Sequence, residues 1–191
     1  MRRVVLLEHI SLDGYLAAAD GDMSWIAVDD ELWEYVTPII DAADTAIYGR
    51  VTYQIMQAYW PTAASDPQAS PHDIHHGHWT RTATKLVFSK TLPAAPWDDS
   101  GDATLIREDA ASVIRRLRHG SGKDMLLLGS ASLARCLIAE NLVDDYRLNV
   151  NPVIVGGGTP LFTDLSSPRR LKLASSRAFK SGVVGLHYTA D

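Results

Sequence analysis

Short β-prone runs that alternate with segments of helical period constrain this chain more than any other feature. Apolar or β-branched runs occupy residues 4–10, 45–48, 85–89, 103–107, 125–128 and 146–155. Several of the intervening stretches repeat apolar residues three or four positions apart, as Leu32, Val36 and Ile39 do. That spacing is typical of a helix with one buried face. Alternating strands and helices predict an α/β fold with a mixed, mostly parallel sheet and crossover helices.

The end of the chain departs from this alternation. The runs at residues 171–179 and 183–189 flank Ser181-Gly182 and have no helix between them, which predicts a closing antiparallel hairpin at one edge of the sheet. The segment from Pro61 to Thr80 has no apolar period and holds three prolines, so we expect a long exposed loop there. We see no repeat, low-complexity tract or linker, and a single domain over residues 1–191 is the economical prediction.

Charge and composition exclude several classes of protein. The formal net charge of −5 argues against non-specific nucleic-acid binding, which requires a basic face. No apolar stretch approaches the roughly 20 residues needed to span a bilayer, so we expect no membrane segment. The one cysteine cannot form an internal disulfide, which fits a reducing, cytoplasmic location.

Two strand-to-helix junctions are the candidate ligand sites. One carries Gly49-Arg50-Val51-Thr52 and the other Gly129-Ser130-Ala131-Ser132, each directly after an apolar run. A glycine lets the backbone approach a ligand, and the free N–H groups of a helix N-terminus attract phosphate. Taken alone, each glycine can equally be a structural turn residue. The common G-x-G-x-x-G dinucleotide fingerprint is absent after the first strand.

Together these segments resemble a known superfamily. The run from Gly49 to Tyr53 is similar to the G-R-x-T-aromatic signature of dihydrofolate reductases, and Leu86 to Lys90 resembles their next strand. Gly129-Ser130 resembles the glycine pair that lies beneath the pyrophosphate in those enzymes. Residues 151–158 and the Ser-Leu-Asp-Gly run at 11–14 are closer to the reductase domains of riboflavin biosynthesis. The resemblance runs from Val4 to about Phe162.

This resemblance implies a dihydrofolate-reductase-like three-layer α/β/α fold and a reductase that transfers a hydride from NADPH to a small pterin- or pyrimidine-like heterocycle. The cofactor-binding residues it implies are Gly49, Arg50, Thr52, Ser89, Lys90, Gly129, Ser130 and Ser132. It also implies a C2 homodimer, because the related reductases pair through the region of the last long strand and the closing hairpin.

Two carboxylates are candidates for the catalytic acid. The resemblance points to Asp30, near the start of the first helix, and alternatively to Asp13 in the loop after the first strand. Reduction of a C=N bond needs a proton with the hydride, and a carboxylate among aromatic side chains can supply one. Each can equally be a helix-start or turn aspartate. The implied substrate-binding residues are Trp25, Trp33 and Glu34.

The chain departs from true folate reductases, and two other functions stay open. Glu34 occupies a position where those enzymes usually place an apolar residue, and serine rather than glycine follows Gly129. The first alternative is a non-enzymatic nucleotide-binding domain of the same fold. The second is a zinc- or nickel-binding protein that uses His72, His75, His76 and His78. We expect no metal site, because ligands usually sit on a rigid framework and this segment is flanked by prolines.

Overall fold

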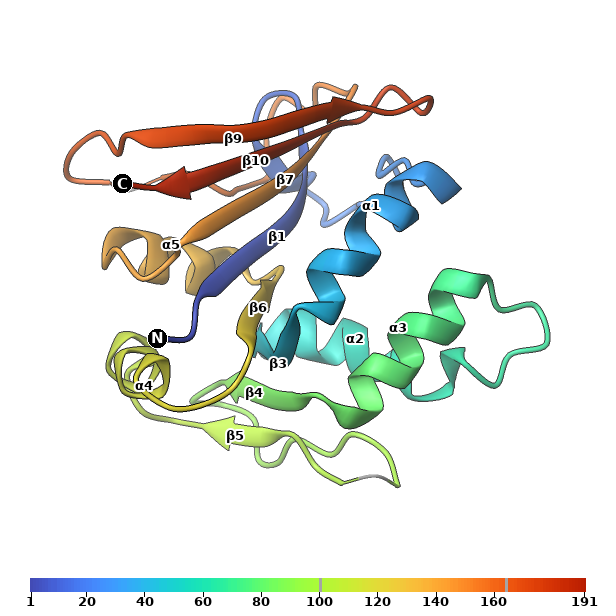
Figure 1. Ribbon diagram of the computed structural model, residues 1–191, viewed down its shortest axis with the longest axis vertical. Coiled ribbons are helices and arrows are strands. Elements are labelled where there is room, and N and C mark those ends of the chain that lie inside the picture. The colour runs from blue at the N-terminus through green and yellow to red at the C-terminus, as the bar shows by residue number, and fades with distance from the viewer. Residues whose placement is uncertain (100, 164) are drawn as a thin grey trace.

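The computed structural model describes residues 1–99, 101–163 and 165–191. Within these ranges a central sheet of eight strands runs in the order β5-β4-β3-β6-β1-β7-β10-β9 (Figure 1). Its strands are β1 Val4–Ser11, β3 Ala43–Gly49, β4 Thr84–Phe88, β5 Thr104–Ile106, β6 Asp124–Leu128, β7 Asp145–Asn151, β9 Leu171–Ala178 and β10 Val184–Ala190. A separate two-stranded sheet pairs β2 Tyr15–Ala17 with β8 Thr159–Pro160.

The sheet is parallel from β5 to β7 and antiparallel at its C-terminal edge. Neighbouring strands from β5 through β4, β3, β6 and β1 to β7 all pair in parallel. β10 pairs antiparallel with both β7 and β9. The mixed sheet and closing hairpin predicted from the sequence are therefore confirmed.

Helices cover both faces of the sheet. The helices are α1 Asp30–Asp41, α2 Arg50–Ala63, α3 Pro71–Thr82, α4 Ala110–Arg118 and α5 Ala131–Ala139. Figure 1 shows α1, α2 and α3 on one face and α4 and α5 on the other. None of the helices in the described part of the chain is long and apolar enough to cross a bilayer.

The side chains of β1 point alternately to the two faces of the sheet, so this strand contributes to two hydrophobic clusters. Val5 and Leu7 pack in a cluster with residues of α1, whereas Val4, Leu6 and Ile10 pack in a second cluster with residues of α5. Successive side chains of a strand point to opposite faces of its sheet. The apolar run therefore supplies both layers, as expected for a strand buried on both sides.

The end of one strand and the presence of a second, small sheet differ from the sequence-based prediction. The strand predicted to reach Val155 ends at Asn151 in β7, because Pro152 has no N–H with which to continue the ladder. The small β2–β8 sheet was not predicted. It brings the loop after β1 against the glycine-rich loop at residues 156–158, where a Cβ on Gly158 would collide with the carbonyl oxygen of Ala17.

Candidate functional site

The two predicted glycine junctions lie side by side at the carboxyl edge of the parallel strands. β3 ends at Gly49 and α2 begins at Arg50, while β6 ends at Leu128 and α5 begins at Ala131. β3 and β6 are hydrogen-bonded neighbours, so both helix N-termini open at the same edge. Ligands of open α/β sheets bind at this edge.

A hydroxyl network joins the two junctions. The hydroxyl of Ser130 accepts the backbone N–H of Gly49 at 2.6 Å and donates to Oγ1 of Thr52 at 2.8 Å. Ser130 therefore does not cap α5, and no side chain among the described residues caps α2 either. Two uncapped helix N-termini lie close together, which is the arrangement that favours an anion.

The backbone at the second junction is unusually close-packed. Gly129 has a φ of +57°, and a Cβ on it would lie 2.7 Å from Oγ1 of Thr52. Ser130 follows with a φ of 67°, a left-handed conformation that few non-glycine residues adopt. The turn is thus held in shape by Thr52 and Gly49, and glycine is required at position 129.

The remaining predicted cofactor residues follow the ends of neighbouring strands at the same edge of the sheet. Gly49 pairs with Phe88 across β3 and β4, so Arg50 and Ser89 follow paired residues at one edge. The Arg50 side chain is exposed, with Nη1 donating to Oε1 of Gln54 at 3.2 Å. The Ser89 hydroxyl accepts the N–H groups of Thr91 and Leu92 at 3.2 and 3.1 Å. Lys90 and Ser132 are exposed as well, so the two cations, Arg50 and Lys90, are both accessible to solvent.

The two candidate carboxylates have different surroundings. Asp30 is the exposed first residue of α1, whose cap is Asp29. The carboxylate of Asp13 accepts the hydroxyl of Ser11 at 2.6 Å and the backbone N–H groups of Val155 and Gly156 at 3.1 and 2.8 Å. These bonds, led by the one from Ser11, lower the pKa of Asp13. Asp13 therefore fastens the glycine-rich loop to the end of β1.

The three predicted substrate residues have different surroundings. Trp33 stacks on His72 with ring centroids 3.6 Å apart and an interplanar angle of 7°. The indole N–H of Trp25 donates to the carbonyl oxygen of Asp22 at 3.1 Å, and Glu34 is exposed on α1. Their roles stay predictions.

The segment predicted as a long exposed loop is largely helical, so that prediction is wrong. α2 continues to Ala63, and α3 begins at Pro71. Ser70 and Asp73 form a reciprocal capping box, and a proline at the first helical position reinforces this start. The apolar period is missing because histidines occupy the core-facing positions.

Two of these histidines lie in an aromatic cluster between α1, α2 and α3. His72 stacks on Trp33, and the His76 ring lies 4.0 Å from that of Trp60. Burial lowers the pKa of His72 to about 4 and that of His76 to about 3. In residues 1–99, 101–163 and 165–191, no three His, Cys, Asp or Glu side chains are grouped to hold a metal ion.

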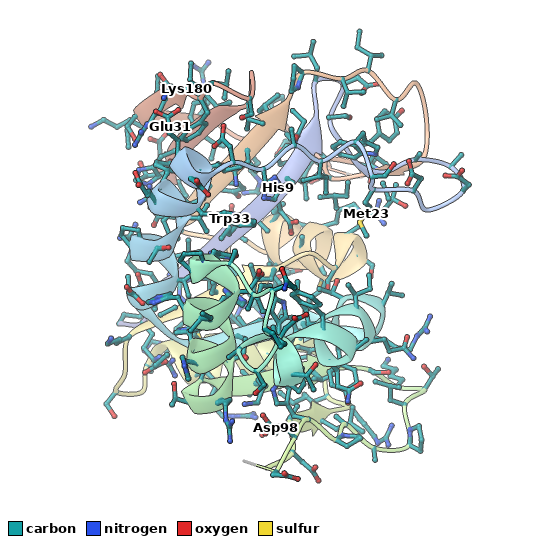
Figure 2. The ribbon with its side chains drawn as sticks, turned by 90° about the vertical axis from the view of Figure 1, so that its right-hand side faces the viewer. His9, Met23, Glu31, Trp33, Asp98 and Lys180 are labelled. Carbon is teal, nitrogen blue, oxygen red and sulfur yellow. The ribbon has the colours of Figure 1, made fainter. Side chains whose placement is uncertain are left out.

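Three polar residues of the sheet interior were not singled out as site residues. Glu8 and His9 interrupt the apolar run of β1, and His9 pairs in register with Asn149 of β7. Nδ1 of His9 and both amide atoms of Asn149 are buried without a hydrogen-bond partner in the described part of the chain. Burial lowers the pKa of His9 to about 4. Figure 2 shows His9 between Trp33 and Met23 on the side of α1.

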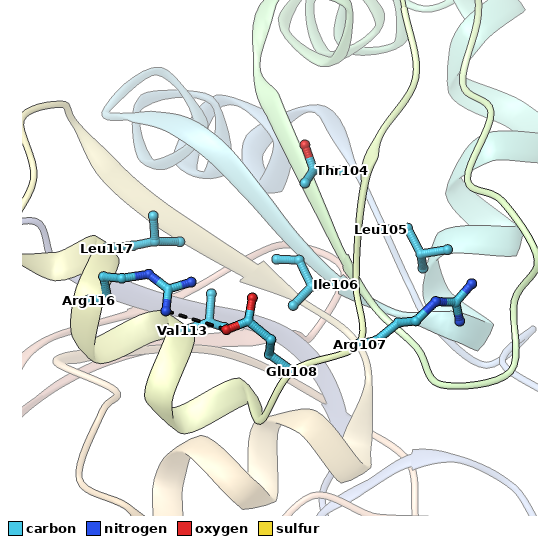
Figure 3. Close-up of a pocket in the computed structure, with 8 residues that line it drawn as sticks. All are labelled: Thr104, Leu105, Ile106, Arg107, Glu108, Val113, Arg116 and Leu117. Carbon is cyan, nitrogen blue, oxygen red and sulfur yellow. Dashed lines mark hydrogen bonds and ion pairs between the residues drawn. The ribbon is translucent and has the colours of Figure 1, made fainter.

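A surface hollow of about 490 Å³ lies elsewhere, between β5 and α4 (Figure 3). Arg116 and Glu108 pair at its rim at 3.4 Å. It includes neither glycine junction, so its shape does not bear on the site described above.

Comparisons with known proteins agree with this architecture. The family model described as the RibD C-terminal domain matches residues 2–185. The chain is 32% identical over 189 residues to YyaP of Bacillus subtilis (strain 168), covering 98% of this chain and 94% of YyaP. It is 28% identical over 188 residues to YwjB of the same strain, covering 98% of this chain and 97% of YwjB.

Solved structures share the fold at low sequence identity. A putative riboflavin biosynthesis protein from Shewanella sp. PV-4 matches with a TM-score of 0.76 and 20% identity, covering 100% of this chain and 99% of that one. A pyrimidine reductase-like protein from Corynebacterium diphtheriae matches with a TM-score of 0.71 and 16% identity, covering 100% and 92%. The resemblance and the fold predicted from the sequence are confirmed.

Proposed function

Because the chain belongs to the RibD C-terminal domain family, we propose that it is an NADPH-dependent reductase acting on a small pterin- or pyrimidine-like heterocycle. The observation that carries this proposal is the pair of uncapped helix N-termini joined through Gly49, Ser130 and Thr52. The structural similarity to a pyrimidine reductase-like protein supports the reaction class. The family and fold are established, whereas the cofactor and substrate are our inference.

The residues at the glycine junctions suit a dinucleotide. The N–H groups that open α5 would bind the diphosphate, with Gly129 allowing close approach and Ser132 offering a further hydroxyl in the first turn. Arg50 and Lys90 would bind the phosphate on the adenosine ribose, and the hydroxyl of Ser89 would complete that site. Bound NADPH supplies the hydride. The protein's part is to bind and orient both reactants at the carboxyl edge of the sheet.

The substrate end of the site is proposed to lie toward β1 and α1. The β1–β6 pairing ends at Leu7 and Leu128. His9 and the Gly129–Ser130 turn both follow directly after the end of this pairing. Trp33 lies on the same face (Figure 2). A neutral imidazole and a buried amide at Asn149 offer hydrogen-bonding groups to a flat heterocycle. We keep Trp25, Trp33 and Glu34 as the proposed substrate-binding residues.

Replacing Arg50 by alanine tests the cofactor. NADPH carries a ribose phosphate of about −1.5 to −2 charge that NADH lacks. An ionic hydrogen bond to it is worth about 1.5–3 kcal/mol, so Arg50→Ala should weaken NADPH binding by about ten- to a hundredfold and leave NADH binding nearly unchanged. Titration of both cofactors by quenching of tryptophan fluorescence at low salt measures this.

Two further variants separate the effect of losing the positive charge of Arg50 from the effect of destabilising α2. Arg50→Lys should recover part of the NADPH affinity, because it retains the positive charge. Gln54→Ala removes the observed partner of Arg50 and should keep the preference for NADPH. Equal losses of both cofactors in Arg50→Ala would contradict a role for Arg50 at the ribose phosphate.

Replacing Asp30 by asparagine tests the catalytic acid. Asp30 is the better candidate of the two, because the carboxylate of Asp13 is engaged by Ser11, Val155 and Gly156. Loss of a general acid typically lowers turnover by about 100-fold or more. Asp30→Asn should therefore slow NADPH oxidation with a substrate heterocycle while leaving NADPH affinity unchanged. Wild-type turnover in both Asp30→Asn and Asp13→Asn would remove both carboxylates from the mechanism.

The assembly we propose is a homodimer formed through the hairpin edge. β9 ends the sheet, and all of its residues except Leu171 are exposed, including Leu173. A long edge strand with apolar side chains favours pairing with a second copy.

A further inference from the structure

We propose that Glu8 is a positioning residue for the Gly129–Ser130 turn of the anion site. In this proposal the turn binds a phosphate only while the carboxyl group of Glu8 carries its proton and is neutral. This inference rests on the proposed function, because it concerns the turn to which the cofactor diphosphate is assigned. It adds a form of regulation to that site, namely coupling of cofactor binding to proton concentration.

Glu8 lies directly behind the turn. It pairs with Leu148 of β7, and the neighbours on its own side of β1, Leu6 and Ile10, belong to the apolar cluster under α5. Its side chain is 4% exposed. The β1–β6 register ends at Leu7 and Leu128, so Glu8 and Gly129 are the next residues of the two strands, and the backbone N–H of Gly129 acts to lower the pKa of the Glu8 carboxyl group. Oε1 is buried and has no hydrogen-bond partner among the described residues.

No charged group among the described residues compensates a negative charge on this carboxyl group. In the described part of the chain, no ion pair or side-chain hydrogen bond reaches Glu8. Titratable groups on the elements that cover this side of β1 include Arg135 and Cys136 of α5, Tyr146 of β7, Tyr188 of β10 and Tyr15 of β2. Nη1 of Arg135 donates instead to the carbonyl oxygen of Pro160 at 3.2 Å. Burial therefore raises the pKa of Glu8 well above its ordinary value, and the nearby backbone N–H of Gly129 opposes this shift.

The charge of Glu8 decides what the turn can bind. When the group is neutral, it places no charge beside the turn, and the positive ends of α2 and α5 remain free to attract an anion. When the group is ionised, a buried negative charge lies beside the turn, where screening by water is weak. Phosphate and carboxylate then repel each other, and binding of the anion favours uptake of a proton.

The test is the pH profile of NADPH binding in wild type and in Glu8→Gln. Glutamine keeps the shape and a carbonyl oxygen but cannot ionise. From pH 6 to 9.5, wild-type affinity should fall at least tenfold relative to that of Glu8→Gln. Glu140→Gln is the matched control, because it removes an exposed carboxylate just beyond the other end of α5, and it should keep the wild-type profile. Quenching of tryptophan fluorescence measures all three proteins.

A second measurement needs no cofactor. Because the pKa of Glu8 is raised in the folded protein, its stabilising effect is complete below the unfolded value and is lost as pH rises through the folded value. Urea unfolding of the free proteins should show stability falling with rising pH in wild type and Glu140→Gln, and a shallower fall in Glu8→Gln. This readout also reports whether Glu8→Gln is folded.

The outcomes separate the inference from the proposed function. Parallel pH profiles of NADPH affinity in wild type and Glu8→Gln overturn the proton-coupled role and leave the reductase proposal standing. Absence of binding of both NADPH and inorganic pyrophosphate to folded wild type at every pH overturns both. If NADPH affinity loses its dependence on pH only in Glu8→Gln, the proton-coupled role of Glu8 is supported, since replacement of a merely structural residue would change affinity equally at all pH values.

Discussion

Lowering the pH from 7 to 5 should reduce the free energy of unfolding by about 2 kcal/mol for each of His72 and His76. Their folded pKa values are about 4 and about 3, against an ordinary value of 6.5. Between these values the unfolded chain binds protons that the folded chain does not. Stability therefore holds above pH 6.5 and is lost as the pH falls toward the folded values.

The physical cause is the aromatic cluster that holds α3 against α1 and α2. His76 is 5% exposed, and neither of its ring nitrogens has a partner in the described ranges. Its ring contacts Trp60 and Trp79, with centroids 4.0 and 5.3 Å away. An imidazolium in this position would lose its hydration without gaining a carboxylate, so protonation requires α3 to detach.

Phenylalanine variants check this expectation. His72→Phe and His76→Phe keep a flat ring but cannot take up a proton, so each should remove about 2 kcal/mol of the stability lost between pH 7 and 5, while His9, whose pKa is also about 4, accounts for a further part of that loss. His78→Phe is the control, because His78 is exposed on the same helix, and it should retain the wild-type dependence. Urea unfolding followed by tryptophan fluorescence at both pH values measures the effect. An unchanged slope in the double variant would show that these two histidines do not carry the acid sensitivity.

The strand-to-helix junctions could be predicted because they depend on local sequence. An apolar run followed by Gly49 or Gly129 and a helical period fixes where a parallel strand ends. The parallel topology then places all such ends at one edge. What the sequence does not contain is the contact between the junctions. The Ser130 hydroxyl points to Gly49 and Thr52 rather than to its own helix, and this depends on the packing of β3 beside β6.

The α3 region shows why a helix is missed when polar residues occupy its buried positions and the prediction relies on the spacing of apolar residues. His72 and His76 are four residues apart and face the core, yet both are polar in any binary pattern. The capping signal of Ser70, Pro71 and Asp73 was available and favours a helix start. Glu8 and His9 carried a comparable signal, since charged or polar residues inside a buried strand require a partner or a role.

Replacing Gly129 by alanine should have the largest effect at the candidate site. The new Cβ would lie 2.7 Å from Oγ1 and 2.9 Å from Cγ2 of Thr52, closer than non-bonded atoms approach. The left-handed backbone adds strain of about 1–2 kcal/mol, and overpacking typically adds about 1–3 kcal/mol. We expect a loss of about 2–5 kcal/mol of stability and, because the turn must open, loss of NADPH affinity by about 30-fold or more.

Two companion variants divide that loss into its causes. Gly21 has a φ of +86°, and a Cβ on it would meet nothing within 4 Å, so Gly21→Ala should show the backbone strain alone and bind NADPH as wild type does. The double variant Gly129→Ala/Thr52→Ala removes the clashing atoms and should recover the overpacking part of the stability. It should not recover full NADPH affinity, because Ser130 then loses the acceptor at Thr52 that fixes its hydroxyl. Thermal unfolding and cofactor titration on the same samples measure both quantities. If Gly129→Ala behaved like Gly21→Ala in both, Thr52 would not confine the turn, and the close approach of α2 to α5 would have no part in binding the diphosphate.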